Sequence, residues 1–288
     1  MTIDLAPLET LYDVALGGEA PLPIDLAALY GSLRFPAHGL RPYVIGNFVT
    51  TLDGIVSLNT PGQAGGGEIS GFNQHDHMVM GILRAVADAV IVGAGTLRAS
   101  PQHRWIAEHI YPLLAEVYQA LRQSLGKSEP PLNVIVTARG ELDLHLPVFQ
   151  SESISVLIVT TKNGERLLRR QNLPARIHVA AIEGAGFLSA RSVLEAVAQV
   201  RRCDVILTEG GPRLMGGFFA EKCLDELFLT LSPQIAGRDN SSERPGLVVG
   251  KTFAPDHALW GKLINIKRGG DHLFLRYAFE STGLQAEH

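Results

Sequence analysis

One carboxylate, Glu209, stands at the end of an apolar run and directly before two glycines. The run, Val205–Leu207, is rich in β-branched residues, which predicts a short buried strand. Gly210 and Gly211 then form a turn, and Pro212 suits the first turn of a helix because its φ is fixed and no N–H is needed there. A carboxylate at the end of a buried strand is costly to desolvate unless it has a partner or a chemical role. Glu209 is therefore the first candidate for chemistry.

The turn after Glu209 is also suited to binding phosphate. A strand, a glycine turn and a helix N-terminus present free backbone N–H groups and the positive end of a helix dipole. A second turn of this kind follows the apolar run that starts at Asp88, with Gly93, Gly95 and Thr96. Arg98 stands where a dinucleotide-binding fingerprint would have its third glycine, so this turn predicts a backbone phosphate cradle and only a weak Rossmann signal. For each turn, the alternative is a βα connection that binds nothing.

Two further groups of polar residues carry alternative interpretations. Asp53 follows a predicted strand, Tyr43–Val49, and precedes Gly54; Asp-Gly is a turn signal, so Asp53 is either a turn residue or part of a site. The tripeptide 75–77 (His-Asp-His) has metal-ligand side chains, but no third ligand lies at a diagnostic spacing, and aspartate is common at helix starts. We expect no metal site.

Hydroxyls and cations follow two more predicted strands. Thr137 and Arg139 come after the run 133–137, and Thr161 and Lys162 come after the run 154–160. Such groups at strand ends can hold a 2′-phosphate of a dinucleotide, although exposed basic residues also follow strands without a ligand.

Composition excludes several classes of partner. The chain has 288 residues, 46% of them hydrophobic and 19% charged, so it can bury a large core in one large or two small domains. The net charge is −4, from 25 basic and 29 acidic residues, with no basic run; nucleic acid and anionic membranes are poor partners. No apolar run is long enough to span a bilayer, and the start lacks a signal-peptide pattern. Two cysteines, Cys203 and Cys223, are too few for a disulfide framework and predict a cytoplasmic protein.

The remaining elements predict two parts. Residues 1–40 form a helical extension, because Leu5, Leu8, Leu11 and their neighbours have helical spacing and a second short helix ends at Gly31. Residues 41–288 form the main domain. Strands alternate with helices, which we expect at 73–87, 105–124 and 189–199, and this predicts a mostly parallel α/β sheet covered on both faces. Residues 263–278 predict an antiparallel hairpin at the sheet edge.

The motifs, taken in order, resemble a known family. They are Thr51–Gly54, Leu83–Ala85, Ala87–Thr96, Glu209–Pro212 and Asp225–Glu226. Together they are similar to the reductase domain of riboflavin biosynthesis, 5-amino-6-(5-phosphoribosylamino)uracil reductase, over about residues 41–280. The resemblance implies a dihydrofolate reductase-like fold, NADPH as hydride donor, reduction of a ribosyl group to a ribityl chain, and a homodimer.

The resemblance also implies a set of site residues. Glu209 and Asp53 would be catalytic. The substrate would be bound by Ser70, Arg84, Arg104 and Glu209, with Arg84 as a planar, charged fork for the phosphate. The cofactor would lie against Val49, Gly93, Gly95, Thr96, Thr137, Arg139, Thr161, Gly210, Gly211, Pro212, Arg213, Leu214, Met215 and Gly216. Without the surrounding motif, Arg84 would be interpreted as a helix-surface arginine.

Two departures from the family pattern keep other functions open. Ser100 stands where family members usually have an acid after the glycine-turn threonine. The His-x-Glu and Pro-Cys-x-x-Cys signature of the zinc deaminase that is fused to many relatives does not occur, so we expect a stand-alone reductase without zinc. The alternatives are a pterin reductase of the dihydrofolate type and a non-catalytic protein that binds a nucleotide.

Overall fold

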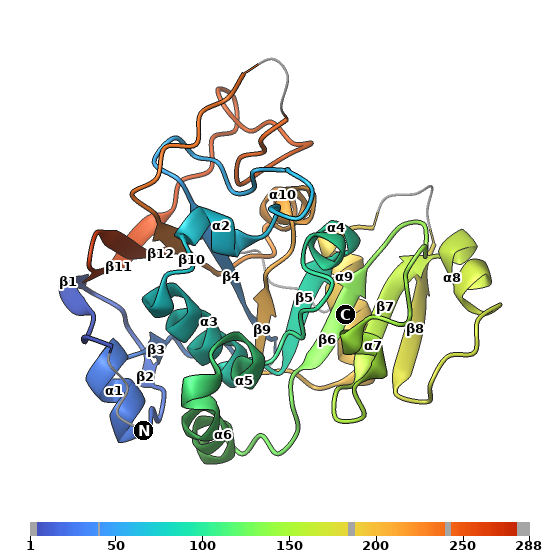
Figure 1. The fold of residues 1–288 in the computed structure, drawn as a ribbon, viewed down its shortest axis with the longest axis horizontal. Helices are drawn as coiled ribbons and strands as arrows, with labels where there is room; N and C mark the ends of the chain where they lie inside the picture. Colours follow the sequence, from blue (N-terminus) through green and yellow to red (C-terminus); the bar gives the residue numbers. More distant parts are fainter. Residues whose placement is uncertain (1–4, 40, 184–187, 240–242, 281–288) are drawn as a thin grey trace.

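A ten-stranded sheet runs through the molecule in the computed structural model, which describes residues 5–39, 41–183, 188–239 and 243–280 (Figure 1). The extreme start, on which the signal-peptide prediction partly rests, and the last residues of the predicted main domain lie outside the described residues. Across the sheet the strands are β1 (Glu9–Asp13), β11 (Lys262–Gly269), β12 (His272–Ala278), β10 (Glu226–Leu231), β4 (Tyr43–Thr50), β9 (Val205–Thr208), β5 (Ala89–Gly93), β6 (Leu132–Val136), β7 (Val156–Thr161) and β8 (Ile177–Ile182).

Strands β10, β4, β9, β5, β6, β7 and β8 are parallel to one another, and β12, β11 and β1 continue the sheet antiparallel beyond β10. The predicted mostly parallel sheet with a C-terminal antiparallel hairpin is therefore confirmed. Because the parallel strands point the same way, their carboxyl ends meet at one edge of the sheet, where ligands of open α/β folds bind.

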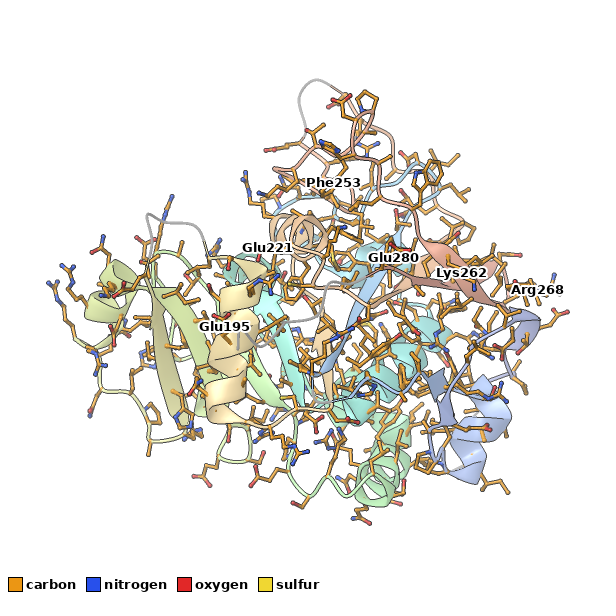
Figure 2. All side chains as sticks on the ribbon, turned by 180° about the vertical axis from the view of Figure 1, so that it is seen from behind. Glu195, Glu221, Phe253, Lys262, Arg268 and Glu280 are labelled. Carbon is orange, nitrogen blue, oxygen red and sulfur yellow. The ribbon has the colours of Figure 1, made fainter. Side chains whose placement is uncertain are left out.

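Helices cover both faces of the sheet. One face carries α1 (Ile24–Tyr30), α3 (Gln74–Val86), α5 (Ala107–Ile110), η1 (Pro112–Leu114), α6 (Ala115–Ser124), α7 (Pro147–Gln150) and α8 (Lys162–Leu168). The other carries α9 (Ala190–Val200) and α10 (Pro212–Ala220), and Figure 2 shows α9 there with Glu195 on its outer side. Two short helices, α2 (Gly66–Ser70) and α4 (Ala94–Ala99), follow the carboxyl ends of strands.

Strand β5 shows why a continuous apolar run forms a central strand. Val90 and Val92 belong to the core under α3, while Ala89 and Ile91 belong to the core under α9 and α10. Alternation along a strand sends successive side chains to opposite faces, and both faces are covered here. Burial of each valine or isoleucine side chain contributes about 1.5–3 kcal/mol to the free energy of folding.

Helix α3 begins and ends close to the predicted positions. Asn73 is its N-cap, and the Asn73 Oδ1 accepts from the Asp76 backbone N–H at 3.1 Å. Met78, Ile82, Leu83 and Val86 are buried, as the apolar spacing predicts. The helix predicted over 105–124, in contrast, is divided into α5, η1 and α6. Pro112 causes the break, since proline lacks the N–H that a continuous helix needs.

The predicted helix over residues 5–15 is wrong. Residues 9–13 form β1, which pairs antiparallel with β11 and occupies the sheet edge predicted for the hairpin. Leu8 is buried while Leu11 is 49% exposed, so the residues with helical spacing do not share one buried face. Backbone pairing along β11 outweighs the weak local helix preference. The second predicted helix is confirmed as α1, and a two-stranded sheet, β2 (Gly18–Glu19) with β3 (Arg34–Phe35), flanks it.

The N-terminal segment packs firmly on the rest of the chain. Leu8, Leu26, Tyr30 and Leu33 belong to the same core as α3, and the buried Lys267 Nζ donates to Thr10 Oγ1 at 2.9 Å. A division of the chain at residue 40 stays a prediction. Within the part of the chain that the structure describes, no helix is both long and apolar enough to cross a membrane.

Candidate active site

The carboxyl ends of β4, β9 and β5 bring together residues from three distant parts of the chain. Strand β9 lies between β4 and β5 and is parallel to both. Val49 lies near the end of β4, Gly93 ends β5, and Glu209 follows β9 directly, its backbone N–H donating to Ile91 O at 2.9 Å. The sequence placed these three residues in one site, and the sheet does bring their strand ends side by side.

Glu209 forms a buried, two-pronged ion pair with Arg84 of α3. Arg84 Nε donates to Glu209 Oε1 at 3.0 Å, and Arg84 Nη2 donates to Glu209 Oε2 at 2.6 Å. The side chains are only 1% and 6% exposed. Desolvation makes a buried pair of this kind costly to break from one side. The two residues that the sequence assigned separately to the substrate are bound to each other.

His103 completes the surroundings of the Arg84 guanidinium. Arg84 Nη1 lies 2.8 Å from His103 Nε2 and also donates to the Ile106 carbonyl oxygen at 3.4 Å. Burial, and then the charge of Arg84, lower the pKa of His103 to about 2, so the ring is neutral and its Nε2 accepts a hydrogen bond from the Arg84 Nη1–H. Sequence reasoning missed His103, because no local spacing marks a loop histidine as an arginine partner.

The glycine turns after β5 and β9 touch. A Cβ placed on Gly93 would stand 3.9 Å from Gly211 N, and one on Gly211 would stand 3.4 Å from Thr96 Oγ1. Gly93 and Gly211 are the N-caps of α4 and α10, and neither helix has a side-chain cap hydrogen bond. Two helix N-termini without side-chain caps, one of them the nine-residue α10, therefore open at the same place.

The chain is matched by the family model described as the RibD C-terminal domain over residues 42–253. It belongs to the RibD C-terminal domain family. It is 28% identical over 217 residues to 2,5-diamino-6-ribosylamino-4(3H)-pyrimidinone 5′-phosphate reductase of Archaeoglobus fulgidus, covering 74% of this chain and 89% of that protein. It is 22% identical over 197 residues to the riboflavin biosynthesis protein RibD of Aquifex aeolicus, covering 68% of this chain and 48% of that protein.

Solved structures show the same fold. A pyrimidine reductase-like protein of Corynebacterium diphtheriae superposes with a TM-score of 0.66 at 20% identity, covering 89% of this chain and 99% of that one. RibD of Acinetobacter baumannii superposes with a TM-score of 0.62 at 18% identity, covering 84% of this chain and 59% of that one. The expected dihydrofolate reductase-like fold is confirmed.

In this RibD C-terminal domain, Asp53 holds two loops together. Its Oδ1 accepts from Thr51 Oγ1 at 2.6 Å and from the Ala236 N–H at 3.2 Å, and its Oδ2 accepts from the Gly237 N–H at 2.8 Å. The hydrogen bond from Thr51, together with the backbone N–H groups, lowers the pKa of Asp53 to about 2. Asp53 is therefore charged near neutral pH and has no proton to donate. Its contacts match the turn-residue interpretation, and its catalytic role stays a prediction.

Because these hydrogen bonds need the charged Asp53 carboxylate, we expect the stability of the folded state to depend on pH. The pKa of Asp53 is lowered in the folded state, so its contribution is present above the unfolded pKa of 3.8 and is lost as the pH falls towards about 2. Asp53→Asn is expected to lower the Tm at neutral pH and to lower it much less near pH 2. The exposed Asp25→Asn is the control. A Tm difference that is the same at both pH values would contradict the assignment.

The predicted substrate residues Ser70 and Arg104 belong to the segments that precede and follow α3 in the chain. Ser70 ends α2 and is 1% exposed, and its carbonyl oxygen accepts from His272 Nε2 at 3.0 Å. Arg104 follows His103 in the loop after α4, and its Nε is buried with no hydrogen-bond partner among the described residues. Ser100 lies across from Glu68: a Cβ on Gly65 would stand 3.3 Å from Ser100 Oγ and 3.1 Å from Glu68 Oε2.

Several predicted cofactor residues have contacts within the protein. Thr137 Oγ1 accepts from the Gly140 N–H at 3.2 Å, and Thr161 caps α8 while donating to the Ala138 carbonyl oxygen at 2.8 Å. Met215 is fully buried in the core under α10. Three more of the predicted cofactor residues belong to α10. Leu214 packs over Gly210, Gly216 faces Val249 O, and Arg213 is exposed. Contact with a cofactor from Met215 or Gly216 would have to involve the backbone.

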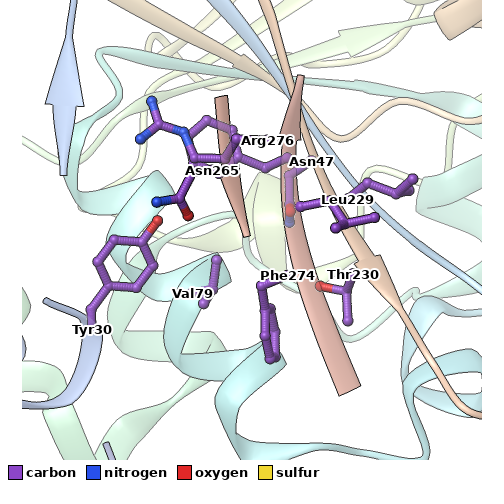
Figure 3. A pocket seen from close by; sticks show the side chains of 10 residues that line it. Tyr30, Asn47, Val79, Leu229, Thr230, Asn265, Phe274 and Arg276 are labelled. Carbon is purple, nitrogen blue, oxygen red and sulfur yellow. The ribbon is translucent and has the colours of Figure 1, made fainter. Parts of the chain in front are cut away.

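A small cavity lies on the face of the sheet that carries α3, with Tyr30 of α1 and Val79 of α3 in its wall (Figure 3). It is lined by Tyr30, Asn47, Val79, Thr230, Asn265 and Arg276, among others, with Phe274 at its base. Asn265 Nδ2 is buried there without a partner among the described residues. The lining comes from α1, α3, β4, β10, β11 and β12, whereas the glycine turns follow β5 and β9, so the cavity is separate from those turns.

The His-Asp-His tripeptide does not form a cluster. His75 Nε2 lies 2.7 Å from the Ala6 carbonyl oxygen, while Asp76 Oδ1 accepts from Thr230 Oγ1 at 2.7 Å. Over the residues that the structure describes, no three His, Cys, Asp or Glu side chains are grouped to hold a metal ion.

Proposed function

We propose that this chain is an NADPH-dependent reductase that converts the ribosyl group of 5-amino-6-(5-phosphoribosylamino)uracil to a ribityl chain in riboflavin biosynthesis. The observation that carries the proposal is the Arg84–Glu209 pair beside the touching glycine turns of β5 and β9, in a RibD C-terminal domain. The name of the Archaeoglobus fulgidus relative, a reductase of a ribosylamino-pyrimidinone 5′-phosphate, supports it.

The residues at the turns fit a dinucleotide. The backbone of Gly93 and Gly211 would hold the pyrophosphate at the uncapped N-termini of α4 and α10. Side chains larger than hydrogen would fill the space between these turns. Val49 would border the nicotinamide. When bound, NADPH supplies the hydride, while the protein provides orientation and a site closed to water.

Arg84 and Arg104 have different roles in this proposal. Four of the five N–H groups of Arg84 are directed at Glu209, His103 and Ile106. Arg84 therefore fixes the Glu209 carboxylate, which faces the substrate. Arg104 Nε is buried and has no hydrogen-bond partner among the residues that the structure describes, so Arg104 is the better candidate to bind the substrate phosphate, with its guanidinium as a planar fork.

A second candidate substrate differs only in its pyrimidine ring. Relatives from Archaeoglobus fulgidus and Methanothermobacter thermautotrophicus, at 28% and 25% identity, are named for 2,5-diamino-6-ribosylamino-4(3H)-pyrimidinone 5′-phosphate. That compound carries an amino group where the uracil compound has an oxygen, and the ribosyl phosphate is the same. The chemistry at the ribosyl carbon is therefore the same for both.

The loss of NADPH absorbance with each of the two pyrimidine phosphates, with dihydrofolate and with no substrate tests this proposal. Oxidation with a pyrimidine phosphate alone supports it and selects the substrate. Oxidation with dihydrofolate alone would assign a pterin reductase. Tight NADPH binding without oxidation by any of the three would assign a nucleotide-binding protein.

Arg139 tests the choice of NADPH over NADH. It follows β6, is 81% exposed, and its only ion-pair partner among the described residues is Glu141 at 3.9 Å. If Arg139 holds the 2′-phosphate, Arg139→Ala should raise the KM for NADPH about tenfold and leave that for NADH unchanged. Arg169→Ala, at another exposed arginine, is the control. An equal change for both cofactors would contradict the role.

A cytoplasmic homodimer completes the proposal. The outer strand β1 is supportive, since Leu11 and Tyr12 are 49% and 42% exposed at an edge of the sheet. Sedimentation of the purified chain would measure its mass in solution, and a monomer would contradict this part.

A further inference from the structure

Asp76 differs from the other buried carboxylates of the described residues. Glu209, Glu226 and Asp225 each form an ion pair with an arginine. Asp76 is 4% exposed, and no Lys, Arg or His nitrogen of the described chain lies within 4.0 Å of its carboxylate. Its hydrogen-bond donor is a hydroxyl, Thr230 Oγ1, at 2.7 Å. A buried carboxylate without a cation is costly when charged, so it favours the protonated form.

The position of Asp76 places it beside the predicted hydride donor. Thr230 of β10 is in register with Val49 of β4, and β4 lies between β10 and β9. Asp76 and Arg84 both belong to α3, so Thr230 and Glu209 meet the same helix from either side of β4. Asn47, two residues before Val49, lines the cavity together with Val79 of α3, and alternation along β4 puts Val49 on this face too. Val49 is thus level with Thr230, the partner of Asp76, on one side, while on the other side Glu209 follows the Gly46–Thr208 pair and lies at the level of Asn47.

The two carboxylates have opposite environments. Glu209 is neutralised by Arg84 as an ion pair. The pKa of Asp76 is raised, first by burial and also by the charge of Glu209, while the Thr230 hydrogen bond, His77 and Ser70 oppose the rise. The other titratable neighbour at this position is His272 of β12, which contacts Asn73 and Ser70. Enzymes often place two carboxyl groups in one site and give them different environments, so that one stays protonated and acts as an acid while the other stays charged.

We propose that Asp76 is the general acid of the reduction, taking the place of the acid that Ser100 has replaced; this inference rests on the proposed function. In its open-chain form the phosphoribosylamino group has a C=N bond between the ribosyl carbon and the amino nitrogen. Hydride adds to the carbon, the π bond breaks, and the nitrogen takes the proton from the Asp76 carboxyl group. The nicotinamide is oxidised, the substrate is reduced by two electrons, and water returns a proton to the Asp76 carboxylate.

Asp76→Asn tests the proposal, because the asparagine Oδ1 can still accept from Thr230. We expect single-turnover reduction to slow at least about 100-fold, the usual size of general acid catalysis, while NADPH affinity, measured by cofactor fluorescence, is unchanged. The wild-type rate should fall as the pH rises through the pKa of Asp76, which gives the pH–rate profile an alkaline limb. The residual rate of the variant should show no such fall. Asp25→Asn, in the first turn of α1 and exposed, is the control and should behave as wild type.

A measurement without cofactor or substrate checks the buried acid itself. A raised folded pKa gives stability that is present at low pH and lost as the pH rises through it. The Tm of Asp76→Asn relative to wild type should therefore be higher at about pH 8 than at about pH 5. If Asp76→Asn does not fold, Thr230→Val is used: removing a hydrogen bond that lowers the pKa of Asp76 should move the alkaline limb of the rate to higher pH.

The outcomes separate this inference from the proposed function. A wild-type chain that reduces neither pyrimidine phosphate overturns both. An active wild type with Asp76→Asn retaining more than a third of its rate, or with the alkaline limb unmoved in Thr230→Val, overturns the role of Asp76 alone. Loss of the rate in Glu68→Gln but not in Asp76→Asn would assign the proton to the carboxylate beside Ser100, and would also overturn it.

Discussion

Glu209→Gln is expected to remove most of the turnover and to destabilise the fold. The substitution leaves the buried Arg84 guanidinium without a charged partner, since the pair is 1% and 6% exposed and its other neighbour, His103, is neutral. Breaking a buried pair from one side costs about 3–5 kcal/mol. If Glu209 faces the reacting centre as proposed, the loss of its carboxylate should lower kcat about 100-fold or more. Thermal unfolding and NADPH oxidation measure the two effects.

Two further variants separate charge from position. Arg84→Lys keeps the charge but loses the two-pronged geometry, and it should show the same loss of kcat with a smaller loss of stability. Glu165→Gln breaks an ion pair with Arg169 at the surface of α8, where the effect on stability should stay below about 1 kcal/mol. Unchanged turnover in Glu209→Gln would remove Glu209 from the catalytic site.

Gly211→Val is expected to weaken cofactor binding with little effect on the fold. The φ and ψ of Gly211, −63° and 169°, are accessible to valine. The first added carbon would stand 3.4 Å from Thr96 Oγ1, so the side chain would fill the space between the two turns. If the pyrophosphate lies there, the KM for NADPH should rise at least about tenfold, with kcat at saturation largely preserved.

Gly18→Val is the matched control for this variant. No atom lies within 4 Å of a Cβ at Gly18, which belongs to the small sheet away from the turns. It should leave the KM for NADPH unchanged. A Gly211→Val protein with a normal Tm and a normal KM for NADPH would contradict the placement of the cofactor at these turns.

The central strands could be predicted because they are apolar on both sides, as a sheet that is covered on both faces requires. Strand β5 is a continuous apolar run, and only a sheet covered on both sides buries all of it. The edges were less predictable. Residues 9–13 have weak helical spacing, and their strand form depends on the backbone of β11, more than two hundred residues later. Pairing between distant segments leaves no local pattern.

The same limit applies to the site. The glycine turns were found because glycine, proline and strand runs are local signals. The contact between Arg84 and Glu209 joins residues 125 positions apart, and only the sheet order brings α3 over the end of β9. The family motifs marked both residues, yet they gave Arg84 to the substrate and could not show that Glu209 neutralises it. His103 and the uncompensated Asp76 depend wholly on burial, which a single sequence does not display.

The most direct test of the reductase assignment follows the hydride itself. The chain would be incubated with NADPH carrying deuterium at C4 and with each pyrimidine phosphate, and the product would be examined by mass spectrometry. We expect a ribitylamino product with deuterium on the former ribosyl carbon, and no such product from Glu209→Gln. Consumption of NADPH without deuterium in a ribityl product, or no consumption with either pyrimidine, would contradict it.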